Sequence, residues 1–158
     1  MKRTHWLELL IAIGVSEGAG MIGSLFTFSQ IPTWYATLAR PELALPSWVF
    51  GPVWTTLYFF MGIAAFLVLR QGLRRNNVRV ALLWFGAQLV LNTLWSVIFF
   101  GIHSIGGALI DIALLWAAIV GTMIAFSRVS KTAGYLLVPY LAWVSFASYL
   151  NYTFWILN

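Results

Sequence analysis

Hydrophobic residues in this chain fall into five long stretches, separated by connections that hold most of the charged residues. Each stretch is long enough to cross a lipid bilayer as a helix, which takes roughly 20 residues. The pattern therefore predicts an all-α integral membrane protein, a bundle of five transmembrane helices that forms a single membrane domain over residues 1–158. The predicted spans are residues 7–28, 48–69, 80–100, 105–126 and 134–157.

The first connection, residues 29–47, is longer than the other three and too apolar for a solvated linker. It contains Trp34 and Tyr35 together with several leucines and prolines. Long connections in compact folds are usually functional or disordered. We predict that this connection forms a lid over one end of the bundle. The alternative is that Trp34 and Tyr35 simply belong to the aromatic belt at the membrane surface.

Polar and aromatic residues inside three spans recur every three or four positions, which places them on one face of each helix. Amides without partners are costly in lipid, so these faces should point into the bundle and bond to one another, to backbone or to a ligand. The faces are Trp84, Gln88, Asn92 and Trp95 in the third span, Tyr140, Trp143, Ala147 and Asn151 in the fifth, and Trp54, Tyr58, Met61 and Ala65 in the second.

These three faces imply an interior with flat apolar walls and a few polar anchors. Aromatic rings stack on a planar ligand while amides fix its orientation, so the pattern is typical of a pocket for a large, planar and mostly apolar molecule. The alternative is helix packing alone, with amides pairing between helices and tryptophans filling the core.

Charge sets the expected orientation of the bundle. Only 8% of residues are charged, compared with about 25% in a soluble domain. If the five spans cross in sequence, eight of the nine Lys and Arg residues lie on one side, which predicts a cytosolic N-terminus and an external C-terminus. The net charge of +5 is better explained by topology and anionic lipid than by nucleic acid. The eight are Lys2, Arg3, Arg70, Arg74, Arg75, Arg79, Arg128 and Lys131, and Arg40 stands alone.

Conventional catalytic and metal-binding groups are scarce in the sequence. Because the chain has no cysteine, disulfides and thiolate metal sites are excluded. No second ligand stands near His103 at metal-binding spacing, so we propose no metal site. Asp111, near the start of the fourth span, suits the helix N-terminus or a partner such as His103. Glu17 lies near the middle of the first span, where a carboxylate is a functional hypothesis; we favour a structural or gating role over ligand or proton chemistry.

Two glycines in the first span, Gly14 and Gly18, create a smooth face that allows a second helix to approach closely. Such a face makes a homodimer plausible. Packing of these glycines within one subunit explains the spacing equally well.

Several short segments identify a family. They are GPVWTTLY at 51–58, AQLVLNTLW at 87–95, IFFG at 98–101, PYLAW at 139–143 and LNY at 150–152. Together with the Trp34-Tyr35 pair, they closely resemble the translocator protein family, known in bacteria as tryptophan-rich sensory proteins. The resemblance covers nearly the whole chain. One departure lies in the first connection, where Leu43 replaces a tryptophan of the family pattern and offers no indole face.

The resemblance implies a five-helix protein, commonly dimeric, that resides here in a bacterial cell membrane. It implies binding of porphyrins such as protoporphyrin IX, and of other lipophilic small molecules, in a pocket beneath the first loop, with no cofactor required. Carried over position by position, the expected ligand-binding residues are Trp54, Tyr58, Asn92, Trp95, Tyr140, Trp143, Phe146, Ala147 and Leu150.

Three function classes remain open at this point. The leading one is a receptor or sensor that binds tetrapyrroles. The second is an enzyme that degrades bound porphyrin under light, with Trp54 and Trp143 reacting with or relaying the excited state. The third is a transporter of porphyrins or lipophilic small molecules, for which intramembrane Glu17 is the best argument, although no internal repeat supports it.

Overall fold

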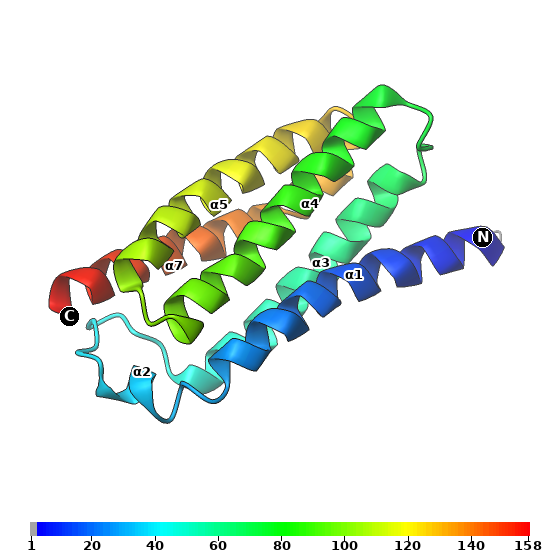
Figure 1. Cartoon of the computed structure of the whole chain (residues 1–158). Helices are drawn as coiled ribbons and strands as arrows, with labels where there is room; N and C mark the ends of the chain where they lie inside the picture. Colours follow the sequence, from blue (N-terminus) through cyan, green and yellow to red (C-terminus); the bar gives the residue numbers. More distant parts are fainter. Residues whose placement is uncertain (1–2) are drawn as a thin grey trace.

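The computed structural model describes residues 3–158, and this part of the chain folds into helices and short connections (Figure 1). Lys2, used above to orient the chain, lies outside the described residues, as does the side chain of Arg3. The helices are α1 (Arg3–Thr27), α2 (Trp34–Thr37), η1 (Ser47–Val49), α3 (Phe50–Leu69), α4 (Asn76–Ser96), η2 (Val97–Gly101), α5 (Ile105–Ser127), α6 (Lys131–Tyr135) and α7 (Val138–Leu157).

Five helical segments are long and apolar enough to cross a membrane, as the hydrophobic pattern predicted. They are His5–Thr27, Ser47–Leu69, Asn76–Gly101, Ile105–Ser127 and Lys131–Leu157. Their bounds fall within four residues of the predicted ones. The protein is therefore an all-α integral membrane protein, which confirms the predicted fold class.

The last span differs from the single helix that we predicted. It consists of α6 and α7, and the chain turns at Leu136 and Leu137 between them. The reason is Pro139, which lies in the first turn of α7. Proline has no backbone N–H and its ring disfavours a preceding helical turn, so a new helix starts there.

The third span also contains a local change in helix type. After Ser96 the chain continues as the π-helical turn η2, in which the Ile102 N–H bonds the Val97 carbonyl over 2.9 Å. A π turn holds more residues than an α turn, so it rotates the side chains that follow. Phe99 and Phe100, which are neighbours in this turn, are both buried.

The helices pack lengthwise, with α1 against α3, α4 against α5, and α5 against α7. Figure 1 shows the N-terminal end of α1, the α3–α4 connection and the α5–α6 connection at one end of the bundle. The first connection, with α2, lies at the opposite end together with the C-terminus. The basic connections thus share one end, while Arg40 lies at the other, as the topology argument requires.

Close packing of α1 on α3 depends on a glycine. A Cβ atom at Gly62 would lie 2.6 Å from the Cα atom of Ile13, a backbone atom that cannot rotate away. Gly20 has the same role at the pocket, because a Cβ atom there would overlap the ring of Tyr58. By contrast, a Cβ atom at Gly14 or Gly18 would meet nothing within 4 Å. These two glycines are therefore not explained by packing within the subunit.

Candidate functional site

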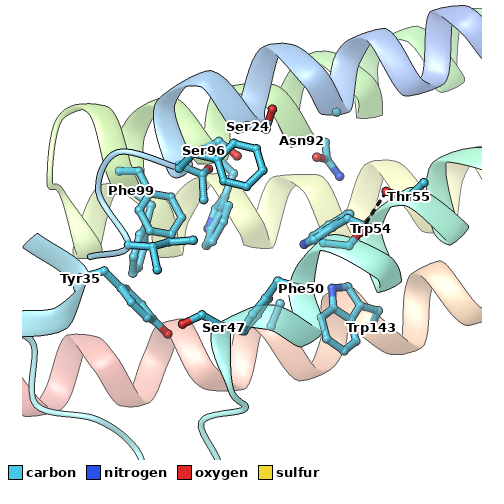
Figure 2. A pocket seen from close by; sticks show the side chains of 18 of the residues that line it. Ser24, Tyr35, Ser47, Phe50, Trp54, Thr55, Asn92, Ser96, Phe99 and Trp143 are labelled. Carbon is cyan, nitrogen blue, oxygen red and sulfur yellow. Dashed lines mark hydrogen bonds between the residues drawn. The ribbon is translucent and has the colours of Figure 1, made fainter. Parts of the chain in front are cut away.

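A cavity of about 380 Å³ opens inside the bundle at the end covered by the first connection. Figure 2 shows side chains from several helices pointing into it, with Asn92 and Trp143 at one end and Tyr35 and Phe99 at the other. Four of the membrane spans contribute rows of residues at helical spacing. They are Glu17, Gly20, Met21, Ser24 and Thr27 from α1, with Phe28 directly after it; Phe50, Gly51, Trp54, Thr55 and Tyr58 from α3; Asn92, Trp95, Ser96, Phe99 and Phe100 from α4 and η2; and Trp143, Ala147, Leu150, Asn151 and Phe154 from α7.

Aromatic rings form most of the cavity wall. Trp54 stacks on Tyr58, with centroids 5.6 Å apart, and meets Trp143 edge to face at 6.4 Å. On the opposite side, Trp95 stacks on Phe99 at 5.0 Å. Rings held in offset or edge-to-face contact keep fixed orientations. The cavity therefore presents rigid, flat apolar surfaces.

A chain of hydrogen bonds lies behind the inner end of the cavity. The Tyr58 hydroxyl donates to Asn92 Oδ1, and Asn92 Nδ2 donates to the Tyr140 hydroxyl over 2.7 Å. Tyr140 in turn donates to Gln88 Oε1 over 2.7 Å, and Gln88 Nε2 reaches Met61 Sδ at 3.7 Å. All five side chains are buried. The predicted inward direction of Gln88 and Asn92 is confirmed, and the chain fixes the amide of Asn92 at the cavity surface.

Asn151 anchors a second part of the wall. Its Oδ1 accepts a hydrogen bond from Trp95 Nε1 over 2.9 Å, and its Nδ2 donates to the Ile105 carbonyl over 3.0 Å. The amide is buried and faces inward, as predicted. The indole of Trp95 is therefore held in one orientation by a bond between α4 and α7.

Two polar groups at the cavity have no partner among residues 3–158. The buried Nε1–H of Trp143 makes no hydrogen bond there. The half-buried Glu17 carboxylate also makes no hydrogen bond or ion pair within that part of the chain, where the one ion pair joins His5 to Glu8 at 3.3 Å. A buried donor without a partner is costly. The cavity wall thus includes an indole whose N–H is enclosed by protein without a partner, on α7, and a free carboxylate on α1.

The first connection covers the outer end of the cavity. Tyr35 is 8% exposed and lines the cavity beside Ile31 and Ser47. Burial raises the pKa of the Tyr35 phenol above its usual value, and the Arg40 guanidinium, 5.6 Å from its ring centroid, partly opposes this. A side chain in the aromatic belt would face the membrane surface, whereas Tyr35 is buried against the bundle. The structure therefore favours the predicted lid over an aromatic belt.

Two further contacts hold the lid in place. Trp34 packs against Phe99, with centroids 5.5 Å apart, and stacks on His103 at 4.2 Å. At the other end, Asn158 Oδ1 accepts from the Ala39 N–H over 2.8 Å while Asn158 Nδ2 donates to the Ala39 carbonyl over 3.1 Å. The lid is therefore fixed both to the π turn of the third span and to the end of α7.

Seven of the nine predicted ligand-binding residues line the cavity, namely Trp54, Tyr58, Asn92, Trp95, Trp143, Ala147 and Leu150. Tyr140 does not line it, because this side chain is 1% exposed and lies behind Asn92. Phe146 does not line it either and packs against Trp143 at 5.9 Å. Contact between the seven residues and a ligand stays a prediction.

Two further expectations need correction. Trp84, placed above on the inward face of the third span, is 43% exposed. Its ring lies over Gly121 of α5, where the absence of a side chain leaves room for it. Asp111 does not pair with His103, whose Nε2 bonds Gln30 Oε1 at 3.0 Å. Asp111 is instead buried, with one carboxylate oxygen unpartnered among residues 3–158.

Other cavity residues were not predicted as ligand contacts from the sequence. Glu17 was expected to have a structural or gating role, but it lines the cavity. Its spacing of three, four and seven residues to Gly20, Met21 and Ser24 was a usable signal for a common face. Phe99 and Phe100 gave the same kind of signal, because they follow Trp95 and Ser96 by four residues each and so continue the face that begins at Asn92. No group of three His, Asp or Glu residues within the described chain is close enough to hold a metal ion.

Comparison with known proteins gives a consistent result. A sequence model of the TspO/MBR family matches residues 12–156. The chain is 50% identical over 152 residues to the tryptophan-rich protein TspO of Chlorobaculum tepidum, which covers 96% of each chain. It is 42% identical over 135 residues to the translocator protein of Homo sapiens, covering 85% of this chain and 80% of the human one. It is 40% identical over 147 residues to the tryptophan-rich sensory protein of Cereibacter sphaeroides, covering 93% and 89%.

Proposed function

Because this chain belongs to the TspO/MBR family, we propose that it is a membrane receptor or sensor that binds tetrapyrroles such as protoporphyrin IX, or other planar lipophilic ligands, inside the bundle. The names of its relatives, tryptophan-rich sensory protein and translocator protein, support a sensor or receptor role. The observation that carries the proposal is the cavity of about 380 Å³ walled by fixed aromatic rings. Its volume lies within the range of roughly 300–1,000 Å³ typical of ligand pockets.

Each part of the wall has a distinct role in this proposal. Trp54 and Trp95 offer flat faces on which a conjugated ring system stacks. The indole ring of Trp143 adds a further aromatic face at the inner end of the wall. The buried Tyr35 then covers the outer end, so the ligand is held away from water.

We also propose the membrane orientation that the charges predict. The basic connections near Arg70–Arg75 and Arg128–Lys131 share one end of the bundle (Figure 1), and this end faces the cytosol of a bacterial cell. The lid and the cavity then open toward the external side. Cysteine placed at Ala39 in this cysteine-free chain tests the orientation: a membrane-impermeant thiol reagent should label it in intact cells.

A titration with protoporphyrin IX in the dark tests the binding function. We expect saturable tryptophan quenching by the detergent-solubilised protein at micromolar or tighter affinity. A Trp143→Ala, Asn92→Ala double variant removes one wall and one anchor, so its affinity should fall at least tenfold. Trp155→Ala is the matched control, because this tryptophan is 52% exposed and lies outside the cavity. Equal and unsaturable quenching in all three proteins would contradict the proposal.

The contact between two cavity tryptophans favours a second candidate function, light-dependent breakdown of the bound porphyrin. Trp54 and Trp143 both line the cavity, with centroids 6.4 Å apart. A pigment bound in the cavity would lie against both rings, which would then be placed to relay its excited state. The expected result is loss of porphyrin absorbance under illumination that slows markedly in Trp54→Phe and Trp143→Phe. Light-independent or unchanged loss in these variants would leave binding as the function.

A further inference from the structure

We propose that Glu17 makes the cavity selective for planar ligands that carry a cationic nitrogen at their innermost edge. The inference rests on the proposed binding function and adds the chemical class of the ligand. Three observations support it: the depth of Glu17 in the membrane, the absence of a counter-charge beside it within residues 3–158, and the acceptor group near it.

Glu17 lies at the inner end of the row of α1 residues that line the cavity. It stands ten residues before the end of α1 at Thr27, which is about 15 Å along the helix axis. This distance is half of the roughly 30 Å hydrocarbon core. On the neighbouring helices the row ends at Tyr58, Asn92 and Trp143. The carboxylate therefore lies at mid-membrane depth, at the inner end of the cavity.

The carboxylate lacks a counter-charge within the described chain. No hydrogen bond or ion pair of Glu17 is found among residues 3–158, and the cavity lining contains no Lys, Arg or His. Placing such a charge at the centre of a span costs about 3 kcal/mol on insertion scales, which is why intramembrane carboxylates face cavities and find partners there. The remaining source of a partner is the occupant of the cavity.

A second acceptor lies near Glu17. The Tyr58 hydroxyl, which packs against α1 at Gly20 one turn from Glu17, gives its hydrogen to Asn92 Oδ1. Its oxygen therefore presents lone pairs to the cavity. An ammonium or a protonated ring nitrogen satisfies both acceptors with charge-assisted hydrogen bonds. The stacked rings of Trp54 and Tyr58 add cation–π attraction.

The same arrangement fixes how a ligand with acidic groups is oriented. A carboxylate at the inner end would face Glu17 and be repelled, so acidic substituents must point to the lid. Arg40, at the lid, is held over Tyr35. The inner end of the cavity is thus negative, whereas Arg40 places a positive charge on the lid, outside the lining residues.

Two planar tricyclic probes of nearly equal shape test the inference. 9-Aminoacridine is a cation at neutral pH, whereas acridine is neutral. We expect the wild-type protein to bind 9-aminoacridine at least tenfold more tightly than acridine in tryptophan-quenching titrations, since hydrogen bonds to charged groups contribute about 1.5–3 kcal/mol and 1.4 kcal/mol is tenfold. In Glu17→Gln the ratio should fall to about one through weaker binding of the cation alone.

Glu8→Gln is the matched control, because Glu8 lies on the same helix, outside the cavity and paired with His5. It should keep the wild-type ratio. A ratio of about one in the wild type, an unchanged ratio in Glu17→Gln, or an equal loss in Glu8→Gln would each overturn the inference. A parallel protoporphyrin IX titration separates the two proposals. Saturable porphyrin binding without cation preference refutes the role of Glu17 alone, and no saturable binding of either ligand class refutes both.

Discussion

At the scale of single residues, the inner end of the cavity depends on side chains that do not touch it. Asn92 presents its amide to the cavity because Tyr58 and Tyr140 occupy its oxygen and nitrogen from either side. Tyr140 is bonded onward to Gln88. In an apolar interior, each member of such a chain is costly to leave unpaired. The chain thus links the shape of the pocket to the stability of three helices.

We predict that Tyr140→Phe destabilises the protein by about 2–4 kcal/mol. The change leaves the Asn92 amide hydrogen and the Gln88 oxygen without partners, and each unsatisfied buried group costs about 1–3 kcal/mol. Denaturation in mixed detergent micelles measures the loss. Tyr135→Phe, at a tyrosine that is 72% exposed, should change the free energy of unfolding by less than about 0.5 kcal/mol. A Tyr140→Phe protein as stable as this control would show that the chain is dispensable.

A second residue-scale prediction concerns alkaline pH. The folded pKa of Tyr35 is raised by burial, so its neutral form is favoured in the closed lid. The resulting contribution to lid closure is complete below the usual pKa of about 10 and is lost as pH rises through the folded value. Ligand release should therefore accelerate above about pH 10 in the wild type and much less in Tyr35→Phe. The same acceleration in both proteins would assign the effect to other groups.

At the scale of secondary-structure elements, α1 and α3 approach closely because one position lacks a side chain. We predict that Gly62→Ala destabilises the protein by about 1–3 kcal/mol, since the new methyl group would press on the Ile13 backbone. Gly86→Ala is the control, because no atom lies within 4 Å of its added carbon. It should be neutral or stabilising by up to about 1 kcal/mol. Equal effects of the two changes on thermal stability would contradict the packing argument.

The lid is the second element whose position can be tested. Asn158→Ala removes both hydrogen bonds to Ala39, which at an exposed site contribute about 1 kcal/mol together. Hydrogen–deuterium exchange of residues 33–45 should therefore become about fivefold faster. Asn77→Ala, which removes a local bond to the Val78 N–H, should leave exchange of the lid unchanged. No difference between the two variants would mean that the lid is held by the Trp34 contacts alone.

At the scale of the whole molecule, α1 exposes many apolar side chains, and its Gly14 and Gly18 form a smooth face with open space around it. We propose that this face packs on α1 of a second copy, because small residues allow close contact between helices in a membrane. Gly18→Leu should weaken the dimer at least tenfold, as measured by cross-linking in native membranes. Gly86→Leu, at another open glycine, should not. A dimer unaffected by Gly18→Leu would place the interface elsewhere.

The sequence by itself determined the spans, the fold class and part of the cavity wall. Span length follows from the thickness of hydrocarbon, and the stripe through Trp54 and Tyr58 follows from the helical period, so both depend on local spacing. The family motifs include Trp54 and Tyr58 and so identified these two positions independently of the helical period.

Only the tertiary structure decided which residues of each stripe reach the cavity. Tyr140 and Trp84 share stripes with cavity residues, yet one is buried behind Asn92 and the other covers Gly121. Glu17 enters because Gly20 lets α1 pack against Tyr58. The physical reason is that helical spacing fixes which residues share a face, whereas the distance and rotation between helices, set by contacts far apart in sequence, fix what that face meets.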